Sequence, residues 1–66
     1  PMLESGQTGV VVAMLQAALK YLGYDPTWVD GEFGVRTNNM LMAFQAEHGL
    51  DADGICGQQT WTALVK

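Results

Sequence analysis

The chain has 66 residues, of which 48% are hydrophobic, and its net charge is −4, a composition that fits one small globular domain and argues against disorder. Lys20, Arg36 and Lys66 are its only lysine and arginine residues, too few to neutralise the phosphates of a nucleic acid, and an acidic chain is repelled by an anionic membrane surface. No apolar run reaches the roughly 18 residues of a transmembrane helix.

The first predicted element is a helix over residues 9–22. Apolar residues recur there at the spacing of one helix face: Val12, Leu15, Leu19 and Leu22. Thr8 is expected to cap the start of the helix with its hydroxyl. Gly23 is expected to end it in a left-handed conformation, and Tyr24 to anchor the loop that follows.

Two further helices are predicted, over residues 35–48 and 58–65. Gly49 is expected to end the middle helix as Gly23 ends the first one. No segment alternates between apolar and polar residues for long enough to predict a strand. The expected fold class is therefore all-α, a compact three-helix bundle that forms a single domain over residues 1–66.

One phrase, D-G-x-x-G-x-x-T-x-x-x-L, occurs twice. It reads "DGEFGVRTNNML" at residues 30–41 and "DGICGQQTWTAL" at residues 53–64. An apolar residue followed by Gln, and then a glycine stop, precedes each copy: Leu15-Gln16 with Gly23, and Phe44-Gln45 with Gly49. The bundle is therefore predicted to consist of two overlapping helix–loop–helix units that share the middle helix.

The repeated phrase has the residue types of a structural turn. An Asp carboxylate can accept from the backbone N–H two residues on, and the following Gly can take a positive φ. The second Gly is expected to let the backbone pass close to a neighbour, and the Thr hydroxyl to bond back to the Asp or to the loop backbone. We expect Phe33 and Cys56 to point inward as apolar plugs. The predicted turn residues are Asp30, Gly31, Gly34, Thr37, Asp53, Gly54, Gly57 and Thr60.

Catalytic and metal-binding sites are not predicted. A Cys–His nucleophile would need His48 and Cys56 within hydrogen-bond reach, yet His48 falls in the last turn of a helix and Cys56 at a plug position. Aligning Gly54 with the invariant glycine of an EF-hand places Gly49 and Thr60 where the loop needs acidic ligands. One His and one Cys are too few for zinc, so we expect no metal and no cofactor.

The ordered set of motifs resembles the peptidoglycan-binding domain family. It comprises G-x-x-V-x-x-L-Q from Gly9, G-Y at Gly23, D-G-x-F-G-x-x-T from Asp30, F-Q-x-x-x-G-L from Phe44 and D-G-x-x-G-x-x-T-W-x-x-L from Asp53. The likeness covers about residues 6–65. Two departures are the Met40-Leu41 pair, where the family often has Ala-Val, and Cys56, where a small aliphatic residue is usual. The resemblance implies a non-catalytic, wall-targeting module of a bacterial or phage cell-wall hydrolase.

Candidate ligand-binding residues lie in the long loop and at the starts of the second and third predicted helices. They are Trp28, Arg36, Asn38, Asn39, Gln58, Gln59 and Trp61. An aromatic ring beside polar groups suits a sugar or a short peptide, and helix starts offer N–H groups to the carboxylates of peptidoglycan stems. Trp61 could equally be a core residue, and the amides could be ordinary surface residues. Gln16 and Lys20 are expected on the far side from this groove.

The sequence thus predicts a monomer that binds peptidoglycan outside the cytoplasm, in the cell wall or envelope, next to a tethered catalytic domain. Because the chain begins at Pro1 rather than Met, we expect it to be a fragment of a longer, exported protein. Two alternatives remain open. One is a protein–protein docking module or pro-segment of a protease or secretion component, and the other is a small hydrolase.

Overall fold

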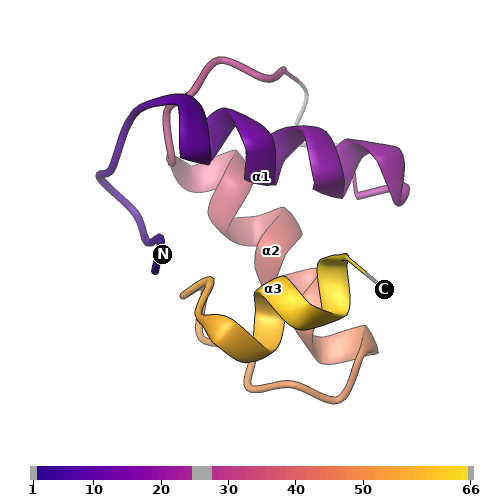
Figure 1. The fold of residues 1–66 in the computed structure, drawn as a ribbon. Coiled ribbons are helices and arrows are strands. Elements are labelled where there is room, and N and C mark those ends of the chain that lie inside the picture. The colour runs from indigo at the N-terminus through magenta and orange to yellow at the C-terminus, as the bar shows by residue number, and fades with distance from the viewer. Residues whose placement is uncertain (1, 25–27, 66) are drawn as a thin grey trace.

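The computed structural model describes residues 2–24 and 28–65, and its described part contains the helices α1 (Val10–Tyr21), α2 (Val35–Glu47) and α3 (Gln58–Leu64). Figure 1 shows α2 passing between α1 and α3. The all-α fold class is confirmed, and each helix begins and ends within one residue of its expected bounds. Residues 25–27, part of the long loop predicted after the first helix, lie outside the described residues.

A single hydrophobic cluster joins the helices, the loops and the N-terminal segment. Its buried members are Leu3, Val12, Leu15, Leu19, Phe33, Leu41, Phe44, Cys56 and Leu64. Phe33 and Cys56 are buried as the repeated phrase predicts. Leu22 is an exception to the predicted apolar face, because α1 ends at Tyr21 and leaves Leu22 42% exposed as its C-cap.

Glycine ends α1 and α2 in the same way. Gly23 has a φ of 97° and Gly49 a φ of 72°. In each case the next residue reaches back to the helix: the Tyr24 N–H donates to the Leu19 carbonyl at 2.8 Å, and the Leu50 N–H donates to the Gln45 carbonyl at 2.8 Å. These are Schellman-type ends, which satisfy carbonyl groups that a helix end leaves without a partner, and they confirm the predicted stops.

The N-terminal cap of α1 differs from the prediction. Gly9, Gly34 and Gly57 are the N-cap residues, so none of the three helices has a capping side chain at that position. The prediction that Thr8 caps α1 is wrong, because Thr8 instead forms an isolated antiparallel bridge with Glu32.

Close backbone approach occurs at the first glycine of each phrase, not at the second as expected. A Cβ built on Gly34 meets nothing within 4 Å, whereas one built on Gly31 lies 3.2 Å from the Gly9 carbonyl oxygen. A Cβ on Gly54 would lie 2.1 Å from Asn38 Oδ1. Gly31 and Gly54 also have the predicted positive φ, of 76° and 73°.

Replacing Gly54 by alanine is therefore expected to lower the free energy of unfolding by about 2 kcal/mol, because it adds left-handed strain and forces the Asn38 side chain to turn away from its contact with Met42 Sδ. Gly23→Ala is the matched control, since Gly23 has a φ of 97° but open space around it. The Gly23→Ala variant should lower the free energy of unfolding only by the backbone strain, about 1 kcal/mol. Chemical denaturation of both variants measures the difference, and equal losses of stability would contradict the effect of Asn38.

The N-terminal segment contacts both turns, which the sequence did not predict. Leu3 exchanges backbone hydrogen bonds with Cys56, at 3.1 and 2.8 Å. The Gly9 N–H donates to the Gly31 carbonyl at 2.9 Å, and the Phe33 N–H donates to the Gln7 carbonyl at 2.9 Å. In Figure 1 the segment runs from the start of α1 down toward the loop that precedes α3. The two repeated phrases are thus tied together by one short strip of backbone.

Candidate functional site

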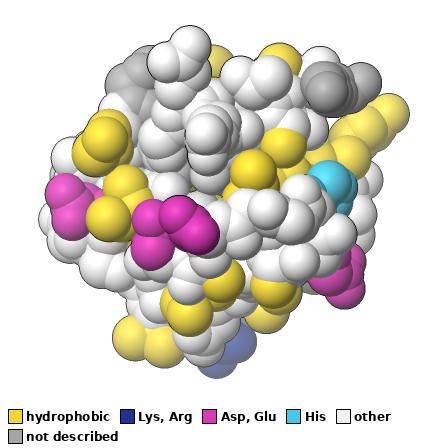
Figure 2. Space-filling model, turned by 90° about the horizontal axis from the view of Figure 1, so that it is seen from below, with side chains coloured by type: hydrophobic (Ala, Val, Ile, Leu, Met, Phe, Trp, Pro, Cys, Tyr) yellow, Lys and Arg dark blue, Asp and Glu magenta, His cyan; other side chains and the backbone are white. Residues whose placement is uncertain are grey.

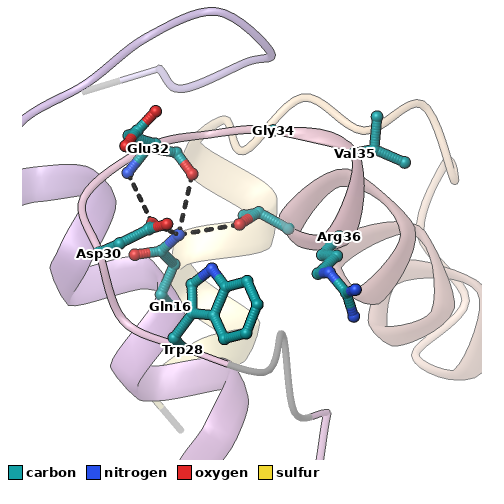
Figure 3. Close-up of a pocket in the computed structure, with 8 residues that line it drawn as sticks. Gln16, Trp28, Asp30, Glu32, Gly34, Val35 and Arg36 are labelled. Atoms are coloured by element: carbon teal, nitrogen blue, oxygen red, sulfur yellow. Dashed lines mark hydrogen bonds between the residues drawn. The ribbon is translucent and has the colours of Figure 1, made fainter.

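A buried glutamine organises the first turn. Gln16, on α1, is 1% exposed. Its Nε2 lies 3.0 Å from Asp30 Oδ1, 3.0 Å from the Glu32 carbonyl oxygen and 2.9 Å from Thr37 Oγ1. Its Oε1 accepts from the Gly31 N–H at 2.9 Å. One side-chain amide therefore joins α1, the turn and the first turn of α2 (Figure 3).

The second turn repeats the arrangement around Gln45 of α2. Its Nε2 lies 3.3 Å from Asp53 Oδ1, 2.9 Å from the Ile55 carbonyl oxygen and 3.1 Å from Thr60 Oγ1. Its Oε1 accepts from the Gly54 N–H at 3.1 Å. Each partner corresponds to one in the first turn. The glutamine before each glycine stop is therefore part of the repeated unit.

The aspartates of both turns make the predicted backbone bonds. Asp30 Oδ1 accepts from the Glu32 N–H at 3.0 Å, and Asp53 Oδ1 accepts from the Ile55 N–H at 2.9 Å. The prediction for the threonines is wrong. Thr37 and Thr60 each accept from the glutamine amide in place of bonding the aspartate or the loop backbone.

Hydrogen bonds to the Asp30 carboxylate lower its pKa below the ordinary value. The backbone N–H of Glu32 contributes most, followed by the Gln16 amide, with a smaller contribution from the Trp28 indole. Donors of this kind stabilise the charged form, and therefore the folded state that supplies them.

The sign of the resulting pH dependence follows from that direction. Because the folded pKa is depressed, the contribution of Asp30 is complete above the unfolded pKa of about 3.9 and is lost as the pH falls through the folded pKa. We expect the wild type to lose stability more steeply below about pH 4 than Asp30→Asn, whose amide oxygen still accepts both bonds. Urea unfolding of the two proteins in matched buffers measures this, and parallel acid profiles would contradict the role of Asp30.

A shallow hollow of about 260 Å³, here called the first cleft, opens beside the first turn. It is lined by Gln16, Trp28, Asp30, Glu32, Gly34, Val35, Arg36 and Thr37. Trp28 is 54% exposed, as expected for a ring available to a ligand. The Arg36 guanidinium carbon lies 5.2 Å from the centroid of that ring, within cation–π range. Figure 3 shows the Trp28 ring between Gln16 and Arg36. Gln16 thus faces the same cleft as Trp28, and its expected position on the far side is wrong.

A corresponding hollow of about 340 Å³, the second cleft, lies beside the second turn. It is lined by Met2, Gln45, Leu50, Asp51, Asp53, Ile55, Gly57, Gln58, Gln59 and Thr60. An adjoining hollow shares Met2, Gly57 and Gln58 with it and is lined in addition by Trp61, Thr62 and Val65. Trp61 is half buried and packs against the core, as the core alternative predicted.

The candidate residues are thus divided between two places. Trp28 and Arg36 line the first cleft, Gln58 and Gln59 the second, and Trp61 the hollow next to the second. Asn38 and Asn39 line neither cleft. Asn38 contacts Met42 Sδ through Nδ2, at 3.4 Å, and lies over Gly54. That any of these residues contacts a ligand stays a prediction.

Cys56 and His48 are in different surroundings. Burial raises the pKa of the Cys56 thiol to about 12, which keeps it protonated and unreactive near neutral pH. His48 is exposed, stacks on Phe44 with ring centroids 4.1 Å apart and has its Nδ1 2.9 Å from the Phe44 carbonyl oxygen.

Within residues 2–24 and 28–65 no group of three or more His, Cys, Asp or Glu side chains is placed to hold a metal ion. In that same part of the chain no helix is long and apolar enough to cross a membrane.

Comparison with known proteins decides the family. A family model described as "Putative peptidoglycan binding domain" matches residues 8–64. The chain belongs to the peptidoglycan-binding domain family. Among solved structures, the SleB N-terminal domain superposes on this peptidoglycan-binding domain with a TM-score of 0.95 at 40% identity, covering 98% of this chain and 89% of that one. The Burkholderia AP3 phage endolysin gives a TM-score of 0.93 at 42% identity, covering 97% of this chain and 24% of that one.

Curated relatives of this peptidoglycan-binding domain are larger proteins named as enzymes. The N-acetylmuramoyl-L-alanine amidase CwlM of Mycobacterium tuberculosis is 55% identical over 53 residues, covering 80% of this chain and 13% of the amidase. The spore cortex-lytic enzyme of Oceanobacillus iheyensis is 42% identical over 64 residues, covering 97% of this chain and 23% of that enzyme. The chain spans less than a quarter of the length of either relative. The family therefore occurs as one part of cell-wall hydrolases.

Proposed function

We propose that this domain binds bacterial peptidoglycan non-covalently and positions an attached cell-wall hydrolase on its substrate. Membership of the family supports peptidoglycan as the ligand, and the enzymes among the relatives support the attachment of a hydrolase. One structural observation carries the proposal to particular residues. Trp28 and Arg36 lie together at the first cleft, where an exposed ring faces a guanidinium group 5.2 Å away.

The chemistry of the first cleft suits a peptide stem. Stem peptides of peptidoglycan end in carboxylates, and a guanidinium group can bind a carboxylate through two parallel hydrogen bonds. The Trp28 ring offers an apolar face beside it for a methyl group or a sugar ring. Because the ring holds Arg36 in place before binding, less side-chain entropy is lost when the ligand arrives.

Binding without catalysis is the proposed role of the domain itself. A shallow cleft on an acidic domain gives modest affinity for a single site. Repeated ligands on an insoluble polymer compensate for this modest affinity, because a domain that dissociates from one site finds another nearby. The domain would act outside the cytoplasm, as a monomer, with the catalytic step performed by the attached enzyme.

The test is co-sedimentation of the purified domain with insoluble peptidoglycan sacculi. We expect retention in the pellet, competition by soluble muropeptides, and no release of labelled wall fragments. Cellulose serves as the control polymer, since it is insoluble but lacks peptide stems. Absence of retention would contradict the proposal, and release of soluble fragments would favour the small-hydrolase alternative. Capture of a protease or secretion component in place of sacculi would favour the docking-module alternative.

A further inference from the structure

We propose that the second cleft is a separate ligand site, which takes an uncharged sugar of the glycan strand while the first cleft takes a stem-peptide carboxylate. This inference rests on the proposed function and names the ligand class for each site. The two clefts occupy equivalent positions of the internal repeat.

The two clefts share one framework. Gln16, Asp30, Gly34 and Thr37 line the first, and Gln45, Asp53, Gly57 and Thr60 line the second at matching positions of the repeat. The glutamine contacts match as well, bond for bond. A surface that the chain builds twice from buried, hydrogen-bonded side chains is rigid in both places. A rigid surface favours binding, because its side chains lose little conformational entropy when the ligand binds.

Charge distinguishes the two clefts. Two acidic side chains line each cleft, Asp30 and Glu32 in the first and Asp51 and Asp53 in the second, but only the first also contains a cation, Arg36. With no cation to offset its two aspartates, the second cleft disfavours a ligand carboxylate. The hydroxyl and acetamido N–H groups of an N-acetyl sugar are donors that a carboxylate accepts, and the amides of Gln58 and Gln59 can both donate and accept.

Apolar side chains complete the second cleft. Met2 is 62% exposed, and Leu50 and Ile55 are partly buried in its lining. Trp61 lines the adjoining hollow, which Met2 and Gln58 share. Figure 2, which views the molecule from below the orientation of Figure 1, shows hydrophobic and acidic side chains next to one another on that face. A pyranose ring has an apolar C–H face and a rim of hydroxyl groups, and this surface matches both.

Two sites of different chemistry fit a polymer in which sugars and peptide stems alternate. The described part of the domain extends over 27 × 21 × 20 Å, so both clefts lie within a short stretch of wall. Occupation of one cleft raises the effective concentration of ligand at the other.

The test uses two soluble probes and the isotopically labelled domain. The uncharged N-acetylglucosamine tetramer is expected to shift the backbone amide resonances of residues 55–59 and the Trp61 indole. A free stem peptide is expected to shift those of residues 34–37 and the Trp28 indole. Tetramer-induced shifts at the first cleft, or no shifts with the tetramer at all, would overturn the second site. Retention of the domain on sacculi would leave the proposed function standing in that case.

Variants give an independent readout. Gln58→Ala combined with Gln59→Ala is expected to weaken tetramer binding about tenfold, as the loss of about two hydrogen bonds implies, and to leave stem-peptide binding unchanged. Gln7→Ala is the matched control, because Gln7 is an exposed glutamine that lines neither cleft and whose side chain accepts from the nearby Glu4 N–H. If the control weakened tetramer binding as much as the double variant, the assignment to the second cleft would be wrong.

Discussion

Replacing Gln16 or Gln45 by leucine is expected to lower the free energy of unfolding by about 3 kcal/mol, a large part of the stability of a domain this small. Leucine approximates the volume of glutamine but neither donates nor accepts. In the Gln45 variant the Gly54 N–H, the Ile55 carbonyl and the Thr60 hydroxyl would each lose the partner they have now. Buried polar groups without a partner cost about 1–3 kcal/mol each, and this exceeds the gain from a more apolar side chain.

Chemical denaturation followed by circular dichroism measures the effect. Gln59→Leu is the matched control, since Gln59 is an exposed glutamine on α3, and its unfolding midpoint should be close to that of the wild type. If Gln16→Leu and Gln45→Leu unfolded at the same denaturant concentration as the control, the glutamine contacts would not stabilise the turns.

The second large effect concerns binding at the first cleft. Trp28→Ala and Arg36→Gln are each expected to weaken retention on sacculi about tenfold, corresponding to about 1.4 kcal/mol. Both residues are exposed, so we expect the domain to stay folded, with a loss of stability smaller than that of the glutamine variants. Trp28→Ala removes the apolar face and the support for the guanidinium group. Arg36→Gln keeps a polar side chain but removes the charge that attracts a carboxylate.

Two matched controls separate local recognition from general surface effects. Tyr21→Ala removes an aromatic ring that is 89% exposed, and Lys20→Gln removes a cation, in both cases at the C-terminal end of α1 and outside the first cleft. The double variant of Trp28 and Arg36 should lose less than the product of the single losses, because the two residues act together. Equal losses in the controls would point to non-specific adhesion.

Local patterns predicted most of the fold. The spacing of apolar residues placed the three helices, and Gly23 and Gly49 end α1 and α2 because each signal acts within a few residues. The bonds from Asp30 and Asp53 to the N–H two residues on are local in the same sense. The prediction that Thr8 caps α1 was wrong because Gly9 is the N-cap residue. Thr8 forms an antiparallel bridge with Glu32, a contact that no local pattern indicates.

Contacts between distant residues were not predicted. Gln16 precedes Asp30 by 14 residues and Gln45 precedes Asp53 by 8, so no fixed spacing joined the glutamine to its turn. The sequence signal for these contacts is the apolar-Gln pair that precedes both glycine stops. The division of the candidate residues between two clefts was missed for the same reason. The repeat places the starts of α2 and α3 beside different turns.

Both the fold and the two clefts depend on one feature, the pair of buried glutamine amides that hold the turns. Native-state hydrogen exchange of the Gly31 and Gly54 amides tests it most directly, because each N–H donates to a glutamine Oε1, at 2.9 and 3.1 Å. We expect the Gly54 amide to exchange only through global unfolding and the Gly31 amide to be strongly protected, in contrast to the exposed loop residue Ala52. Exchange of Gly54 as fast as that of Ala52 would show that the turns open independently of the bundle, which would contradict their role as fixed joints.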